Sequence, residues 1–295
     1  MQSSGAGDRC AVLAVDVGGT KIRVAVVTAE GRLCWSEQHP TPVTGAASVE
    51  QAEQVWAVVE SLVSAAMARG RTVAVGVGCG GPMEDRNETV SPLNIAAWRR
   101  FPLRRRLVDL TGLPVRVDND AKALALAEGR WGAGRGVANY LSMVVSTGVG
   151  GGLVVDGRLL EGGSGNAGHI GHVVVVPGGR ICACGAAGCL EAEASGTAIA
   201  AVTGRSPAAA GPDVIERTGR LVGRAVGSVA NLLDLELTTV AGSVALGFGA
   251  PFFEAAQEEL SATARLPFSA GCRIRPSPLG PDGPVLGAAA VGLAG

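Results

Sequence analysis

Residues 10–28 read CAVLAVDVGGTKIRVAVVT, and this stretch indicates the fold class. The short apolar run at 10–17 predicts a buried strand, and the β-branched run at 22–28 predicts a second strand beside it. The turn between them carries DVGGTK, in which glycines let backbone N–H groups approach phosphate oxygens closely. In this interpretation Asp16 holds Mg²⁺ through water, and the phosphates lie against Gly18, Gly19, Thr20 and Lys21. A hairpin with an ordinary polar turn is the alternative.

The same pattern recurs in the middle of the chain. A strand is predicted at 139–146, and it is followed by a glycine-rich turn at 148–152 and a strand at 153–156. Two copies of strand, glycine turn and strand suggest two related lobes. The second turn supplies further candidate phosphate contacts, which are Thr147, Gly148, Gly150 and Gly151. Gly242, after a strand predicted at 237–241, is a third candidate, although a plain strand-to-helix turn explains it equally well.

Helical and strand patterns fill the rest of the chain. Apolar residues at helical spacing predict a helix over about 48–69. Further helices are expected over 195–203, about 213–234 and 284–294, and before the strand at 272–275. Apolar runs predict strands at 73–79, 114–118 and 272–275. The stretches 86–106 and 161–191 are expected to be irregular. No low-complexity linker separates the predicted lobes.

Asn119 and Asp120 follow the strand predicted at 114–118 and begin a helix that runs to about Arg130. Asn and Asp are preferred N-caps, so a capping role is one interpretation. The other is a base that accepts the proton of a substrate hydroxyl. A carboxylate at a helix N-terminus stays ionised, and phosphoryl transfer depends on positioning more than on base strength.

The most specific pattern is His172 followed by Cys182, Cys184 and Cys189. One imidazole and three thiolates complete the tetrahedral ligand set of a structural zinc ion, and they leave no open position for a catalytic water. We therefore expect Zn²⁺ to order an otherwise irregular loop and to hold the nearby Glu191 rigidly. Free cysteines are the alternative. The other cysteines, Cys10, Cys34, Cys79 and Cys272, lie in or beside apolar strands and are expected in the core.

Composition excludes several classes of protein. The 295 residues are 47% hydrophobic with a net charge of −1, which argues against disorder and against a basic nucleic-acid surface. No apolar run is long enough for a membrane span, and the polar start of the chain predicts a cytoplasmic protein. The spacing Gly76-x-Gly78-x-x-Gly81 resembles a dinucleotide fingerprint, but Pro82 and a polar stretch follow it instead of a helix, so we exclude that site.

Taken together, these motifs resemble the ROK family (repressors, open reading frames, sugar kinases) over nearly the whole chain. DVGGTK and STGVGGG resemble its two phosphate motifs, and GNAGHIGH with CACGAAGCLEAEASG resembles its zinc-and-sugar signature. The resemblance implies an α/β, actin-like ATPase fold with two ribonuclease-H-like lobes and a cleft between them. It also implies transfer of the ATP γ-phosphate to a sugar hydroxyl, usually O6. The family's roles map onto Asp120 as base and onto these sugar contacts: Gly80, Gly81, Asn119, His172 and Glu191.

Two departures from the family pattern bear on the substrate. His169 stands where a sugar-binding Glu is common, and it resembles bacterial N-acetylmannosamine kinases in this respect. An imidazole can donate as well as accept, so we expect altered preference at C1 and C2 of the sugar, unless His169 points away and packs harmlessly. Gly80-Gly81-Pro82 replaces the commoner Pro-Gly-Pro. Glucose, N-acetylmannosamine and an amino sugar such as kanosamine all remain open as substrates.

The expected organisation is a flexible N-terminus at 1–9, a lobe at 10–121, a second lobe with the zinc loop at 122–283, and a terminal helix at 284–295 that packs on the first lobe. We expect a homodimer or homotetramer. A winged-helix repressor is disfavoured because the kinase motifs start near residue 10. A sugar-binding regulator without catalysis is the remaining alternative, and the intact Asp16, Asp120 and glycine turns argue against it.

Overall fold

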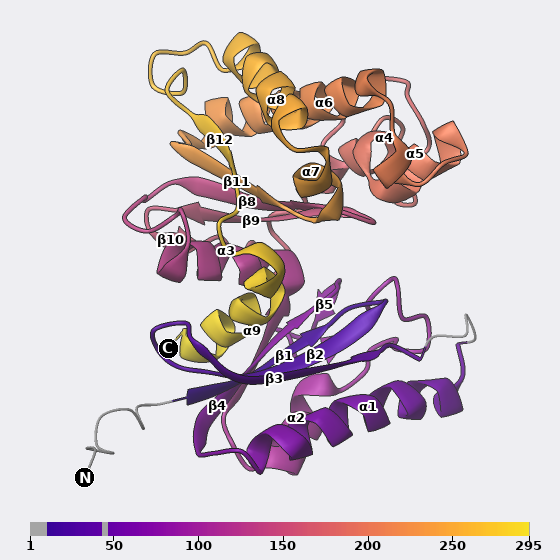
Figure 1. Ribbon diagram of the computed structural model, residues 1–295, viewed down its shortest axis with the longest axis vertical. Helices are drawn as coiled ribbons and strands as arrows, with labels where there is room; N and C mark the ends of the chain where they lie inside the picture. Colours follow the sequence, from indigo (N-terminus) through magenta and orange to yellow (C-terminus); the bar gives the residue numbers. More distant parts are fainter. Residues whose placement is uncertain (1–10, 43–46, 295) are drawn as a thin grey trace. The chain divides into compact units, whose positions relative to one another are not determined.

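The computed structural model describes residues 11–42 and 47–294. The chain divides into two compact units, each with its own five-stranded sheet (Figure 1). Unit 1 holds the chain up to Ala123, the short segment Gly163–Asn166 and the C-terminal stretch from Pro284; unit 2 holds Leu124–Gly162 and Ala167–Gly283. The N-terminus at 1–9 and Cys10, for which we made predictions, lie outside the described residues.

The sheet of unit 1 has the strand order β3-β2-β1-β4-β7. Its strands are β1 (Ala11–Val17), β2 (Lys21–Val27), β3 (Leu33–Pro40), β4 (Thr72–Cys79) and β7 (Val115–Asn119). Strands β1, β2 and β3 are antiparallel neighbours, whereas β4 is parallel to both β1 and β7. Asp16 pairs with Gly78, and Cys79 pairs with Asn119, so the polar residues that end these strands share one edge of the sheet.

Helices cover both faces of this sheet. Figure 1 shows α1 (Val49–Met67) and α2 (Leu103–Thr111) beside one face and α9 (Gly283–Leu293) beside the other. The hydroxyl of Ser48 caps α1 by accepting from Gln51 N, and the predicted apolar stripe of α1 is buried except for Met67, which is exposed. Helix α9 approaches β4 so closely that a Cβ on Gly76 would lie 2.0 Å from Ala288 O. Gly76 thus serves close packing. A small sheet of β5 (Met83–Glu84) and β6 (Thr89–Val90) completes the strands of unit 1.

Unit 2 repeats the topology of unit 1. Its sheet has the order β10-β9-β8-β11-β12, made of β8 (Tyr140–Val145), β9 (Val149–Val155), β10 (Arg158–Leu159), β11 (Leu237–Ala241) and β12 (Arg273–Pro276). As in unit 1, three antiparallel neighbours are followed by two parallel strands. The repeat predicted from the two glycine turns is therefore present as a repeat of strand order.

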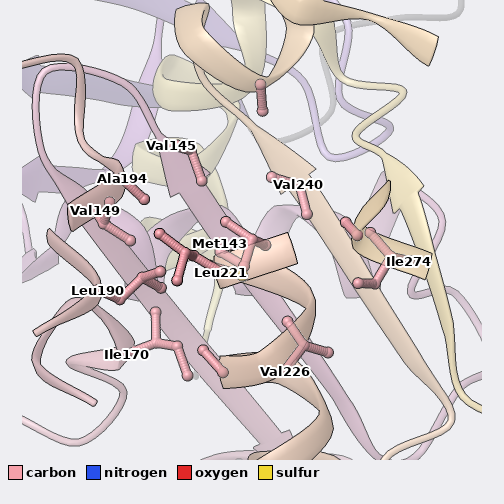
Figure 2. Close-up of a cluster of buried hydrophobic side chains, with 14 of the residues drawn as sticks. Met143, Val145, Val149, Ile170, Leu190, Ala194, Leu221, Val226, Val240 and Ile274 are labelled. Atoms are coloured by element: carbon pink, nitrogen blue, oxygen red, sulfur yellow. The ribbon is translucent and has the colours of Figure 1, made fainter. Parts of the chain in front are cut away.

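The helices of unit 2 also lie on two faces of its sheet. Figure 1 shows α6 (Pro212–Leu233) and α8 (Ala250–Thr263) over one face and α3 (Asp120–Trp131) at the other. The shorter helices are α4 (Leu190–Ala194), α5 (Gly196–Thr203) and α7 (Ser243–Phe248), with 3₁₀ turns at Ile170–His172, Pro207–Ala209 and Gly280–Asp282. The core under α6 gathers side chains from β8, β11 and β12 and from the irregular 161–191 stretch (Figure 2). Among the described residues, no helix is long and apolar enough to cross a membrane.

The structure differs from the predicted secondary structure in three places. Strand β3 was missed, because it is an edge strand whose residues are mostly exposed and polar. The stretch 86–106 is not wholly irregular, since it holds β6 and the start of α2, which buries only Leu103 and Leu107. The region after β11 holds two helices, α7 and α8, separated at Gly249.

Two predictions about single residue types are also wrong. Cys34 is exposed and not in the core, whereas Cys79 and Cys272 are buried as expected. The second glycine turn is shorter than the predicted 148–152. Strand β9 already begins at Val149, because Gly150 and Gly151 pair with Val144 and Met143 of β8.

Candidate functional site

The β1–β2 turn of unit 1 is held in place by its neighbours and leaves its polar side chains exposed. Gly18 N donates to Lys21 O at 3.0 Å, and Thr41 Oγ1 donates to Gly18 O at 2.7 Å. A Cβ on Gly19 would lie 2.4 Å from the Asn94 Cβ, so this position accepts no side chain. Thr20 and Lys21 are exposed. The turn thus offers a hydroxyl and an ammonium on a fixed backbone, as a phosphate site requires.

Asp16 and Asp120 form an acidic pair in unit 1. Asp16 is buried at the end of β1, and burial together with the charge of Asp120 raises the pKa of its carboxyl to about 7, against the opposing charges of Lys21 and Arg23. Burial also raises the pKa of the neighbouring Cys79 thiol. A buried carboxyl group whose ionisation is disfavoured by a second carboxyl group is an arrangement that a divalent cation would relieve.

Asn119 and Asp120 divide the two roles that the sequence left open. Asn119 Oδ1 accepts from Ala121 N at 3.1 Å and from Lys122 N at 3.4 Å, so Asn119 caps α3. Asp120 is the first residue of α3, and its Oδ1 accepts from Ala121 N at 2.8 Å. Because Asn119 serves as the N-cap, the capping role need not be assigned to Asp120, and its interpretation as a base stays a prediction.

The loop with Gly80 and Gly81 follows β4 and lies beside Asn119. A Cβ on Gly81 would be 3.2 Å from Asn119 Nδ2, and one on Gly80 would be 3.4 Å from the Pro92 Cβ. Both glycines are partly exposed. The absence of side chains therefore keeps the backbone near Asn119 accessible.

Sequence reasoning missed three polar residues around this edge of the sheet. Asp118 and Lys122 form an ion pair at 3.0 Å that is almost fully buried. Asn166 exchanges hydrogen bonds with the backbone of Met83, because Met83 N donates to its Oδ1 and its Nδ2 donates to Met83 O, each at 3.1 Å. The spacing of Asp118 and Lys122 at i,i+4 was the available signal for the pair; no local signal pointed to the contact of Asn166.

In unit 2 the glycine turn and Gly242 lie together at the ends of β8 and β11. Ser146 Oγ lies 3.0 Å from Ser243 Oγ. Gly242 has a φ of 100°, and a Cβ there would lie 2.3 Å from Val145 O, so only glycine fits without strain. Thr147 is exposed, and its carbonyl accepts from the Thr197 hydroxyl at 2.9 Å.

Gly148, Gly150 and Gly151 differ in their surroundings. Gly148 lies in the turn beside Glu191, whereas Gly150 and Gly151 are strand residues of β9. Gly151 is buried, and a Cβ there would lie 2.9 Å from Ile170 Cγ2. The phosphate contacts assigned to Gly150 and Gly151 stay predictions, and the close approach of Ile170 is a second reason for glycine at 151.

Glu191 links the loop that carries His172, Cys182, Cys184 and Cys189, here called the zinc-type loop, to the glycine turn. It follows Cys189 by two positions, and its Oε2 accepts from Val149 N at 2.9 Å. A Cβ on Gly148 would lie 2.9 Å from the same oxygen. The carboxylate is thus held at the start of β9 by a backbone hydrogen bond.

His172, Cys182, Cys184 and Cys189 converge as the sequence predicts. One ligand atom from each lies within 4.8 Å of all the others, so the four side chains could hold a metal ion. Cys184 Sγ is 3.7 Å from Cys189 Sγ, and Cys182 Sγ is 3.7 Å from His172 Nδ1. A tetrahedral zinc with Zn–S bonds of about 2.3 Å places neighbouring sulfurs roughly 3.8 Å apart, so the spacing and the donor set both fit Zn²⁺.

The surrounding loop is anchored on both sides of these ligands. Figure 2 shows Ile170 and Leu190, which lie two residues before His172 and one after Cys189, among the core side chains around Met143. Glu193 is buried and binds two arginines, with Arg180 Nη1 at 2.8 Å and Arg217 Nη2 at 2.5 Å. Burial opposes ionisation of Glu193, but the hydrogen bond from Arg180 N and those arginines lower its pKa. These contacts anchor the segments beside the four ligands, and a bound metal ion would join the ligands to one another.

His169 is exposed, and its ring lies nearly parallel to that of His172, with ring centroids 6.1 Å apart.

The predicted site residues are divided between the two units. Unit 1 holds Asp16, Gly18, Gly19, Thr20, Lys21, Gly80, Gly81, Asn119 and Asp120. Unit 2 holds Thr147, Gly148, Gly150, Gly151, His169, His172, Cys182, Cys184, Cys189, Glu191 and Gly242.

Comparisons with curated proteins identify sugar kinases as relatives. A glucokinase of Streptomyces coelicolor is 38% identical over 187 residues, and the match spans 63% of this chain but only 57% of that protein. An N-acetylmannosamine kinase of Yersinia pestis is 37% identical over 276 residues, which cover 86% of this chain and 91% of that one.

Solved structures and a family model complete the comparison. A ROK family glucokinase from Streptomyces griseus, in complex with glucose and AMPPNP, is 28% identical with a TM-score of 0.82 and covers 97% of this chain and 100% of its own. A ROK hexokinase from Thermus thermophilus is 32% identical with a TM-score of 0.79, over 96% of this chain and 98% of its own. The ROK family model matches residues 12–294. The chain therefore belongs to the ROK family and has the actin-like ATPase fold of its sugar kinases.

Proposed function

We propose that the protein is an ATP-dependent kinase that transfers the γ-phosphate to the 6-hydroxyl of a hexose or amino hexose. The observation that carries this proposal is the pair of Asp16 and Asp120, which come from two different strand ends of one sheet. Such a pair provides one carboxylate for a divalent cation and one for a proton. Relatives named glucokinase and N-acetylmannosamine kinase support a sugar as the acceptor.

Asp120 accepts the proton of the sugar hydroxyl in this mechanism. As that proton leaves, the hydroxyl oxygen forms a bond to the γ-phosphorus, and the bond from that phosphorus to the bridging oxygen of ADP breaks. Asn119 caps α3 and thereby fixes the backbone on which Asp120 lies. Gly80 and Gly81 admit the sugar near Asn119 because they carry no side chain.

The β1–β2 turn of unit 1 orients phosphates with Gly18, Gly19, Thr20 and Lys21. Asp16 would hold Mg²⁺ through water, and this ion, when bound, neutralises charge on the transferred phosphate and its neighbour. The raised pKa of Asp16 fits that role, because a buried carboxyl near another acid gains most from a cation. In unit 2, the corresponding turn contributes Thr147, Gly148, Gly150 and Gly151, with Gly242 beside it.

The zinc-type loop of unit 2 supplies the remaining sugar contacts. His172, Cys182, Cys184 and Cys189 would hold Zn²⁺, whose role is to order the loop. Glu191 and His172 contact the sugar from this ordered loop. His169 faces the C1–C2 edge of the sugar and sets the preference among hexoses.

A panel of coupled ADP-release assays tests the proposal. Glucose, N-acetylmannosamine, glucosamine and kanosamine are each offered with ATP and Mg²⁺, and phosphorus NMR of the product identifies the modified oxygen. We expect turnover with at least one sugar and a phosphate at O6. Binding of a sugar by calorimetry without any ADP release would contradict a kinase and favour the catalytically inactive sugar-binding regulator instead.

A further inference from the structure

The buried ion pair of Asp118 and Lys122 reaches a third segment of unit 1. Lys122 Nζ lies 3.0 Å from Asp118 Oδ1 and also donates to Gly165 O at 2.9 Å. Asp118 Oδ1 in turn accepts from Asn119 N at 2.8 Å. These contacts join the carbonyl of Gly165 to the backbone that carries Asn119 and Asp120.

Asn166 extends this connection to a second loop. It follows Gly165 and exchanges two hydrogen bonds with the backbone of Met83, just after Gly80, Gly81 and Pro82. The segment Gly163–Asn166 is the part of the 161–191 stretch that belongs to unit 1. The ammonium group is therefore linked through Asp118 to the backbone of Asn119, and through Gly165 and Asn166 to the loop that carries Gly80 and Gly81.

Stability alone does not account for a buried lysine at this position. Buried ion pairs contribute little net stability, because the loss of hydration offsets the attraction between the charges. Lys122 is only 1% exposed. What the ammonium adds is a second donated hydrogen bond, to Gly165 O, which an apolar side chain of the same length would lack.

We propose that Lys122 is a positioning residue that holds the segment 163–166 against the strand end bearing Asn119 and Asp120 and thereby sets the affinity for sugar. This inference rests on the proposed function for its kinetic consequence. Its structural part, the restraint of the segment, stands without it. Lys122 touches neither the reacting atoms nor the phosphates in this proposal.

The test uses a double variant, Asp118→Asn with Lys122→Met, because Lys122→Met alone leaves a buried carboxylate without its partner. The double variant is neutral and similar in volume, so it should fold, yet it cannot donate to Gly165 O. A second variant, Gly165→Ala, displaces the segment with Lys122 intact, since Gly165 has a φ of 82° and a Cβ there would lie 3.3 Å from Asn87 Oδ1. The matched control is Arg105→Met, which removes the exposed i,i+4 pair with Asp109 on α2.

The first measurement is hydrogen–deuterium exchange at the peptide that carries Met83, without any substrate. Both test variants should exchange the Met83 amide at least about tenfold faster than the wild type, because its acceptor Asn166 is no longer held, while amides of β4 stay protected. Arg105→Met should match the wild type. Unchanged exchange at Met83 in both test variants would show that the segment needs no restraint from Lys122, and it would overturn the proposal.

The second measurement is steady-state kinetics with the best sugar of the panel. Both test variants should raise the KM for sugar by about tenfold or more while the KM for ATP stays within about twofold. Equal changes in both constants, or a change in neither, would overturn the proposal. If the wild type phosphorylates no sugar, the proposed function fails, whereas the exchange at Met83 still decides whether Lys122 restrains the segment.

Discussion

Asp120 combines a local hydrogen bond with an electrostatic contact across the sheet. Its Oδ1 accepts from Ala121 N, and its charge contributes to the raised pKa of Asp16. The geometry around a carboxylate at this place can be kept by an amide of the same shape, whereas its basicity cannot. Catalysis and positioning at residue 120 are therefore separable by one substitution.

Asp120→Asn should lower kcat by about 10²–10⁴-fold and leave sugar binding largely intact, because the loss of a general base affects the chemical step. The coupled ADP assay and calorimetry with the same sugar check the two parts. Residual activity above about a tenth of the wild type would remove Asp120 from the role of base.

His169→Glu should shift the preference of the protein towards glucose. A carboxylate accepts two sugar hydroxyls, whereas a neutral imidazole accepts one and donates one, and each exchanged hydrogen bond is worth roughly 1–3 kcal/mol. The exposed ring of His169 has room for the replacement. The measurement is kcat/KM for glucose against N-acetylmannosamine and amino hexoses in both proteins. A constant ratio would mean that His169 faces away from the sugar.

At the scale of elements, alanine substitutions at two glycines of one short helix should change the free energy of unfolding in opposite directions. Gly242 precedes α7 and has a φ of 100°, and a Cβ there would lie 2.3 Å from Val145 O. Gly247 lies inside α7, and a Cβ there would have no other heavy atom within 4 Å. Gly242→Ala should lower the free energy of unfolding by about 1–3 kcal/mol. Gly247→Ala should raise it by about 0.5–1 kcal/mol, because alanine favours a helix.

Urea denaturation of both alanine variants measures the two changes. If Gly242→Ala were as stable as the wild type, the close approach between the ends of β8 and β11 would not limit this position. Phosphate binding would then remain as the only reason proposed for glycine at 242.

The zinc-type loop should link the zinc content of the protein to its melting temperature. Metal analysis should find one zinc ion per chain, and Cys184→Ser should lower both the zinc content and the melting temperature, because a structural zinc contributes directly to folding. Cys34→Ser is the control, since Cys34 is exposed and lies outside the four-residue cluster. A zinc-free protein with the melting temperature of the wild type would refute the assignment.

At the scale of the whole molecule, the free energy of unfolding should depend on pH because of one buried carboxyl group. Glu128 on α3 is fully buried, and its two oxygens accept from Ser277 Oγ and from Ala133 N. Burial raises the pKa of Glu128 above its ordinary value, and these hydrogen bonds oppose that shift. A group whose pKa is raised by folding binds its proton more tightly in the folded state, so its ionisation removes stability as the pH rises through the raised pKa.

Glu128→Gln should therefore stabilise the protein at about pH 8 and have little effect near pH 4, since the amide stays neutral and can still bond both neighbours. Denaturation midpoints at both pH values check this expectation. The exposed Glu258, 67% accessible, provides the control Glu258→Gln. A destabilised Glu128→Gln at the higher pH would show that the charged form is the one the fold favours.

The local pattern of apolar and polar residues predicted the strands and helices that bury apolar side chains, and it missed those that do not. Strands β1, β4, β8 and β11 were found because they are short runs of mostly apolar residues, and helix α1 was found because its buried residues repeat at helical spacing. Strand β3 was missed, because pairing with β2 and not burial makes it a strand. Gly150 and Gly151 were placed in a turn, because a run of glycines is typical of a turn, whereas the structure pairs both residues with β8.

The sequence by itself determined the repeat of strand and glycine turn, the four metal-type ligands and the acidic start of α3, since each is visible as a pattern of residue types along the chain without any knowledge of strand order. Only the tertiary structure decided that Asn166 binds Met83, that Lys122 reaches Gly165 and that Glu128 bonds Ser277 across 149 positions. These partners depend on strand order and register. Strand order and register arise from the packing of whole units, and no short stretch of sequence contains them.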